Sequence, residues 1–112
     1  MPTRWIADNA REDITRQVPA SGTLVIEIGP PANQIWEVTQ ISLEMPTAPA
    51  GCVAELRDQM NALMSPSYSA RRASASGSQI LNPNEKIRAQ WTGATPGDSG
   101  RVTALYKKGV FQ

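Results

Sequence analysis

The stretch from residue 85 to residue 108 limits the possible folds more than any other part of the chain, because it holds two runs in which apolar and polar side chains alternate. A period of two is typical of a β-strand with one face in the core and the other in solvent. Between the runs, Pro96 and Gly97 suit the central positions of a type II turn, since Pro presets the first and Gly tolerates the positive φ of the second. The pattern predicts two strands joined in a hairpin, with these side chains in the core: Ile87, Trp91, Val102 and Tyr106.

Two earlier segments also have the pattern of strands. Residues 23–28 alternate, with their apolar side chains on one face. Residues 34–45 form a longer strand whose apolar parity changes partway, because Trp36 and Val38 share one parity whereas Ile41, Leu43 and Met45 share the other. Since a slip of one residue turns the following side chains to the opposite face, this segment predicts either a β-bulge near residues 39 and 40 or a strand that continues in a second sheet.

The middle of the chain is less regular. Residues 52–64 fit two structures, since their apolar side chains recur at helical spacing but also alternate over the first five positions. Residues 65–78 are small and polar, which predicts a long loop. A loop of this length in a compact domain is usually functional or disordered.

Several short strands separated by turn signals are typical of an all-β sandwich or barrel. The chain has 112 residues, which is the size of one domain. We therefore predict a single antiparallel β-sandwich domain over residues 13–112, with a long irregular middle loop, preceded by an N-terminal arm over residues 1–12.

The composition argues against several classes of function. The formal net charge is +1, so bulk electrostatics give no reason to bind nucleic acid or a membrane surface. The chain has no histidine and a single cysteine, which removes the usual proton shuttle and any intramolecular disulfide. Ser99 follows Asp98 but no histidine can join them, and nothing in the spacing brings Glu85 near Asp58. We expect no enzyme activity, no catalytic residue, no bound metal and no cofactor.

The hydropathy pattern limits the location of the protein. No apolar run approaches the length that spans a bilayer, and the first residues lack the apolar segment of a signal peptide. We therefore expect a protein that is made in the cytoplasm and is not exported by the usual route.

Five residues are candidates for contacts with other proteins. Trp5 and Ile6 are the large apolar residues of the N-terminal arm, and Trp5 either covers the edge of its own core or anchors the arm on a neighbouring subunit. In the middle loop, Tyr68, Arg71 and Arg72 either are solvated or hold phosphates or an acidic face of a protein. Partner contacts are accordingly expected in residues 1–12 and 58–78.

Three stretches carry a resemblance to a known family: Gly29-Pro30-Pro31 followed by Gln34-Ile35-Trp36-Glu37-Val38; Ile80-Leu81-Asn82-Pro83-Asn84-Glu85-Lys86-Ile87; and Trp91-Thr92-Gly93-Ala94 with Pro96-Gly97 and the returning strand. Together they resemble the small β-sandwich structural proteins of tailed bacteriophages, which decorate or cement a capsid or lie on the virion surface. The resemblance implies a jelly-roll-like sandwich and favours a strand from Cys52 onward. No catalytic or binding residue is carried over by it.

The resemblance also implies a function. A protein of this kind is a virion component that contacts the major capsid protein and copies of itself, with a trimer as one option. The alternative is a receptor- or carbohydrate-binding module of a phage tail or fibre, in which Trp91 would form an exposed platform. A hydrolase that works through Asp98 and Glu85 is a third hypothesis.

Overall fold

The computed structural model describes residues 3–64 and 68–111, and every regular element in this part of the chain is a β-strand. The strands are, in chain order, β1 (Thr3–Gln17), β2 (Thr23–Ile28), β3 (Gln34–Glu44), β4 (Val53–Arg57), β5 (Arg72–Leu81), β6 (Ile87–Thr92) and β7 (Ser99–Phe111). No helix long and apolar enough to cross a membrane occurs among the described residues.

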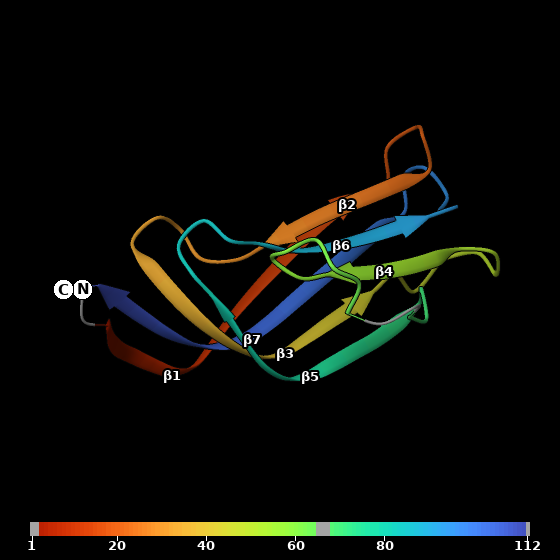
Figure 1. Cartoon of the computed structure of the whole chain (residues 1–112). Helices are drawn as coiled ribbons and strands as arrows, with labels where there is room; N and C mark the ends of the chain where they lie inside the picture. Colours follow the sequence, from red (N-terminus) through yellow and green to blue (C-terminus); the bar gives the residue numbers. More distant parts are fainter. Residues whose placement is uncertain (1–2, 65–67, 112) are drawn as a thin grey trace.

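The seven strands form two antiparallel sheets packed face to face, which confirms the predicted β-sandwich (Figure 1). The four-stranded sheet has the order β1-β7-β3-β5, and the three-stranded sheet has the order β2-β6-β4. We call them the long sheet and the short sheet, after the lengths of their strands. A jelly roll has eight strands, and the described residues form seven, so this finer prediction is not confirmed.

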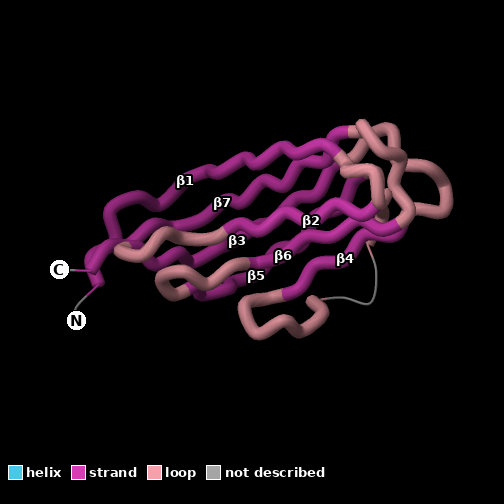
Figure 2. Tube along the Cα trace, turned by 90° about the horizontal axis from the view of Figure 1, so that it is seen from above, coloured by secondary structure: helices cyan, strands magenta, loops and turns pink. Residues whose placement is uncertain are grey.

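The two sheets differ in length by more than a factor of two. Strands of the long sheet have 10 to 15 residues and those of the short sheet have 5 or 6. At about 3.3 Å per step, β1 extends for about 46 Å and β2 for about 17 Å, in agreement with a longest molecular dimension of 46 Å. One end of the long sheet therefore projects beyond the short sheet, and both chain ends lie there (Figure 2).

Two loops meet at this projecting end. The amide of Asn84 donates to the Pro30 carbonyl over 3.2 Å, and Lys86 Nζ donates to the carbonyls of Gly29 and Pro30 over 2.9 and 3.1 Å. On the long sheet nearby, Trp36 stacks on Tyr106 with ring centroids 3.8 Å apart. The loops thus continue the cover that the short sheet begins, and both aromatic rings are buried.

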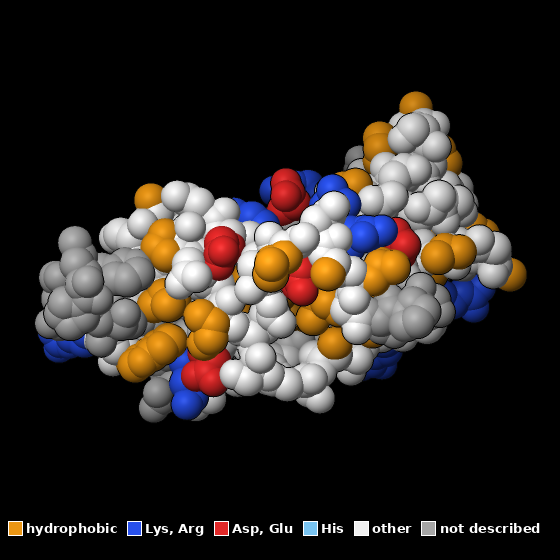
Figure 3. All heavy atoms as spheres, in the orientation of Figure 1, with side chains coloured by type: hydrophobic (Ala, Val, Ile, Leu, Met, Phe, Trp, Pro, Cys, Tyr) orange, Lys and Arg blue, Asp and Glu red, His pale blue; other side chains and the backbone are white. Residues whose placement is uncertain are grey.

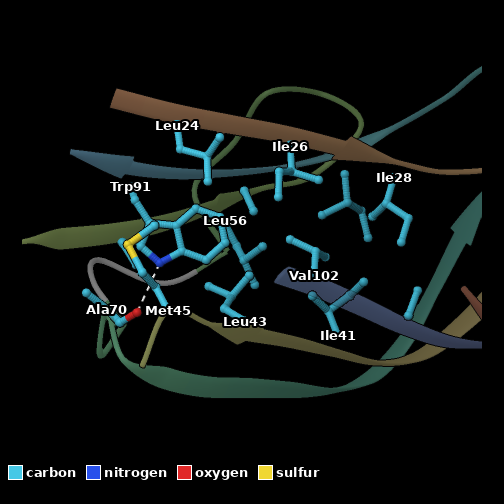
Figure 4. Close-up of a cluster of buried hydrophobic side chains, with 14 of the residues drawn as sticks. Leu24, Ile26, Ile28, Ile41, Leu43, Met45, Leu56, Ala70, Trp91 and Val102 are labelled. Atoms are coloured by element: carbon cyan, nitrogen blue, oxygen red, sulfur yellow. Dashed lines mark hydrogen bonds between the residues drawn. The ribbon is translucent and has the colours of Figure 1, made fainter. Parts of the chain in front are cut away.

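The core lies between the two sheets and matches the predicted apolar positions. Side chains of β2 point toward those of β3 and β7, with Trp91 of β6 closing one end (Figure 4). The buried residues include the predicted ones from every strand that the sequence located: Leu24, Ile26, Ile28, Trp36, Val38, Ile41, Leu43, Met45, Ile87, Trp91, Val102 and Tyr106.

The parity change in β3 is a β-bulge, as predicted. The pairing of β3 with both β5 and β7 shifts register between Val38 and Gln40. Because of this extra residue, Val38 and Ile41 both reach the core, with exposed fractions of 4% and 2%. The strand stays in one sheet, so the alternative of a change of sheet is wrong.

The hairpin predicted for residues 85–108 is wrong, although both strands exist. β6 lies in the short sheet and β7 in the long sheet, so the connection crosses the sandwich. The turn itself is as predicted, because the Asp98 amide donates to the Thr95 carbonyl over 3.1 Å and Gly97 has a φ of +92°. Each strand finds its hydrogen-bond partners elsewhere, β6 with β2 and β4, and β7 with β1 and β3.

The middle and the start of the chain differ from the predicted loop and arm. Residues 53–57 form β4, so this segment is a strand rather than a helix. The predicted loop over 65–78 is too long, because Arg72–Leu81 forms β5 at the edge of the long sheet. Thr3–Gln17 is one strand paired with β7, with register shifts between Trp5 and Ala10. The division into an arm and a domain at residue 12 stays a prediction.

Candidate functional site

A shallow groove of about 600 Å³ crosses the outer face of the long sheet. Its floor is a row of short side chains that the strand register places side by side, Thr103 of β7, Ser42 of β3 and Ser74 of β5. Longer side chains stand in the rows on either side, which gives the groove its walls. We call this feature the cross-strand groove, and its lining is Arg11, Gln40, Ser42, Leu43, Glu44, Arg72, Ala73, Ser74, Arg101, Thr103 and Leu105.

The charges around the groove are mostly paired within the protein. Arg101 Nη2 lies 3.3 Å from Glu44 Oε1, and Arg11 Nε lies 2.9 Å from Asp13 Oδ2. Asp13 also accepts a hydrogen bond from the Thr103 hydroxyl. The bond from Arg11, followed by that from Thr103, holds the pKa of Asp13 below its ordinary value, so this carboxylate is ionised at neutral pH.

The two adjacent arginines of the predicted site have different positions. Arg71 donates from Nε to the Ala48 carbonyl over 2.9 Å, and its own carbonyl accepts from the Met45 amide over 3.0 Å. It therefore fastens the loop after β3 to the start of β5. Arg72 instead lines the groove, and it forms no ion pair with any described residue.

Tyr68 and the pair Trp5 and Ile6 lie away from the groove. Tyr68 is half-buried against the core, and its amide donates to the Ala54 carbonyl over 3.1 Å. Trp5 and Ile6 are exposed, at 44% and 48%, at the projecting end of the long sheet. The strand register places Trp5 in the same row as Ile35, and Arg72 in the same row as Glu44. These two rows are nine residues apart along β3, so Trp5 and Arg72 are separated by about 30 Å. The structure therefore does not bring the five predicted residues together, and their role as an interface stays a prediction.

The predicted site shares only Arg72 with the groove. Arg11 falls in the predicted N-terminal arm, and Arg101 falls on the outward parity of the predicted strand after residue 98. The outward parity of residues 101, 103 and 105 was a usable signal for one strand. The pairing of that strand with β1 and β3 was needed to join it to Arg11 and Ser42, and period-two patterns do not reveal pairing partners.

Two carboxylates weighed as catalytic candidates line a second shallow depression, of about 310 Å³, that also contains Lys86 and Arg88. Asp58 Oδ1 accepts from the amides of Met60 and Ala62 over 2.9 and 3.0 Å, and Glu85 Oε1 accepts from the Asn82 amide over 2.7 Å. Each carboxylate thus stabilises its own turn. Among the described residues, no group of three or more Cys, Asp and Glu side chains has the spacing to hold a metal ion.

The tryptophan platform expected for a carbohydrate-binding module is absent from the position predicted. Trp91 is fully buried and Trp36 is 2% exposed, so neither ring can receive a sugar. The face seen in Figure 3 bears scattered hydrophobic side chains among acidic and basic ones, without a large patch of one kind.

Comparisons with known proteins identify fold relatives only. No family model and no curated protein matches the chain. A chain in the acidic stable capsid structure of Helicobacter pylori bacteriophage KHP30 is similar with a TM-score of 0.59 and 11% identity, over 95% of this chain and 93% of that one. The crystal structure of FLHE is similar with a TM-score of 0.53 and 14% identity, over 89% of this chain and 98% of that one. At these identities the likeness shows a shared sandwich fold.

Proposed function

We propose that the protein is a structural component of a bacteriophage virion that decorates or cements the capsid through protein–protein contacts. The observation that carries the proposal is the fold shared with a chain of the KHP30 capsid over almost the full length of both. Because the alignment leaves little of either chain uncovered, that chain is about as long as this one.

The strand order adds support at the level of topology. In a jelly roll, two four-stranded sheets face each other. Here the long sheet has four strands, and Leu63 and Tyr68 form isolated bridges to β4 at the free edge of the short sheet. We propose that Leu63 and Tyr68 lie where an eighth strand would pair with β4, so that the two sheets follow the jelly-roll arrangement.

The proposal assigns the protein to the virion, with the major capsid protein and further copies of the chain as partners, and gives it no enzymatic role. The long sheet offers a large outer face on which most charges are already paired. A face of this kind suits contact with another protein, because it can be desolvated without leaving many charges unpaired.

The test is the composition and stability of the particle. Particles of the phage that encodes the chain are purified, and the chain is quantified by mass spectrometry against the major capsid protein. We expect a fixed ratio of the two chains, and particles from a deletion strain should lose their DNA at a lower temperature. Particles that lack the chain altogether would exclude the proposal.

Self-association is tested separately by sedimentation of the purified protein. A trimer that persists on dilution supports assembly on a threefold position of the shell. A strict monomer would remove the trimer from the proposal and leave binding to the shell protein to be measured directly.

A further inference from the structure

The cross-strand groove contains several hydrogen-bond donors that have no acceptor among the residues that the structure describes. The hydroxyl groups of Ser42 and Ser74, on the floor, form no hydrogen bond with any described residue. Arg72 forms no ion pair there, and Arg101 uses one guanidinium nitrogen on Glu44, at 3.3 Å. Arginine and serine donors arranged in this way are matched by a ligand that brings acceptors, and a carboxylate is the strongest acceptor that a protein offers.

The shape of the groove restricts the ligand further. The floor crosses β7, β3 and β5, which at about 4.8 Å between strands gives a path of about 10 Å. The groove is shallow and open along this path, so it suits an extended peptide segment rather than a single inserted side chain. Three residues of extended chain cover that distance, and alternate side chains then face the floor.

The charges favour an acidic protein segment over a nucleic acid. Three arginines and one glutamate line the groove. Asp13 pairs with Arg11 and Glu44 pairs with Arg101, so the excess positive charge lies on Arg72. No aromatic side chain lines it, so bases have no surface on which to stack. The whole chain carries a net charge of only +1, which is far from the strongly basic surface that the phosphate backbone requires.

We propose that the cross-strand groove binds an extended acidic segment of the capsid shell protein. Arg72 and Arg101 contact its carboxylates, and the hydroxyl groups of Ser42 and Ser74 donate to its remaining oxygens. The inference rests on the proposed function for the source of the segment, whereas the chemistry of the groove can be tested without it.

The first experiment uses a peptide in place of the shell. An eight-residue peptide of alternating Glu and Ser is added to the ¹⁵N-labelled protein, and backbone amide shifts are followed by NMR. We expect the largest shifts at Ser42, Ser74 and Thr103, and none with a peptide in which Gln replaces Glu. Equal shifts with the Gln peptide, or tighter binding at the same amides by an oligothymidine of eight nucleotides, would overturn the proposal.

Matched variants locate the contact. Arg72→Gln should weaken binding of the acidic peptide by about three- to fivefold, as expected for one exposed charge pair. Arg4→Gln makes the same charge change on an exposed side chain at the far end of β1 and should leave binding unchanged. Equal losses in the two variants would mean that only net charge matters, and the groove would not be the site.

Shell particles without the protein distinguish this inference from the proposed function. If the wild-type protein binds them and Arg72→Gln binds equally well, the groove is not the contact and the proposed function stands. If the shells do not bind the wild-type protein but the Glu peptide shifts the groove amides, the groove assignment stands and the proposed function fails.

Discussion

Replacement of Trp91 by Phe probes the side chain at the centre of the core. Trp91 is fully buried, and its indole N–H donates to the Ala70 carbonyl over 3.0 Å (Figure 4). In W91F this buried carbonyl loses its partner, at about 1–3 kcal/mol, and the smaller ring leaves a void that adds about 1 kcal/mol. The free energy of unfolding should therefore fall by about 2–4 kcal/mol.

The assay is urea unfolding followed by far-UV circular dichroism, since tryptophan fluorescence would itself change. Thermal unfolding gives a second measurement. In a domain of this size each kcal/mol lost lowers the melting temperature by about 4 °C, so we expect a decrease of about 8–16 °C in W91F. Trp5→Phe makes the same exchange at a side chain that is 44% exposed, and should change stability by less than about 0.5 kcal/mol. A W91F protein as stable as W5F would refute the reasoning, because Trp91 could then be neither tightly packed nor hydrogen-bonded.

Three further predictions concern other parts of the fold. A Cβ atom on Gly29 would collide with the backbone oxygen of Glu85, so Gly29→Ala should lower the free energy of unfolding in urea by about 1–3 kcal/mol. Gly51→Ala, where the new Cβ meets no atom within 4 Å, is the control, and an equal cost in both variants would contradict the close approach. Burial raises the pKa of Tyr106 in the folded protein. The stabilisation that the neutral phenol contributes is complete below the ordinary tyrosine pKa near 10, and it should be lost as the pH rises through the higher pKa of the folded state. In Tyr106→Phe that loss between pH 9 and 11 should shrink, and an unchanged profile would assign it to other groups. Burial also raises the pKa of the Cys52 thiol, so it should react more slowly with a disulfide reagent at pH 8 than free cysteine does, and faster in urea; a rate equal to that of free cysteine would contradict the burial.

The core positions of β2, β3, β6 and β7 were predictable, because each of these strands carries its own alternating pattern. Alternation within β2, β6 and β7 identifies the inward face without any knowledge of neighbours, and all of those inward residues are buried. The type II turn at residues 95–98 was also predictable, since Pro and Gly restrict the local backbone. These features depend on interactions that are close in sequence.

The pairing of strands was not predictable from the same patterns. Residues 93–98 look like a hairpin turn, yet the chain uses them to pass from the short sheet to the long one. Alternation says which face of a strand is buried, and a strand that pairs with its neighbour has the same alternation as one that crosses a sandwich. Only residues 79–81 at the end of β5 were predicted as a strand. Residues 72–78 were assigned to a loop, because Ala, Ser and Gly have weak β-propensity, and β5 forms the edge of a sheet.

One β-bulge in β3 accommodates the parity change of its apolar residues and also builds the cross-strand groove. Without the extra residue between Val38 and Gln40, the even-numbered positions would continue on the inner face, and Ser42 and Glu44 would enter the core. The bulge turns both to the outer face, where Ser42 aligns with Thr103 and Ser74, and Glu44 aligns with Arg101 and Arg72. The bulge was predictable because the apolar residues change parity between Val38 and Ile41. The groove was not predictable, because its residues come together only through the register of three paired strands.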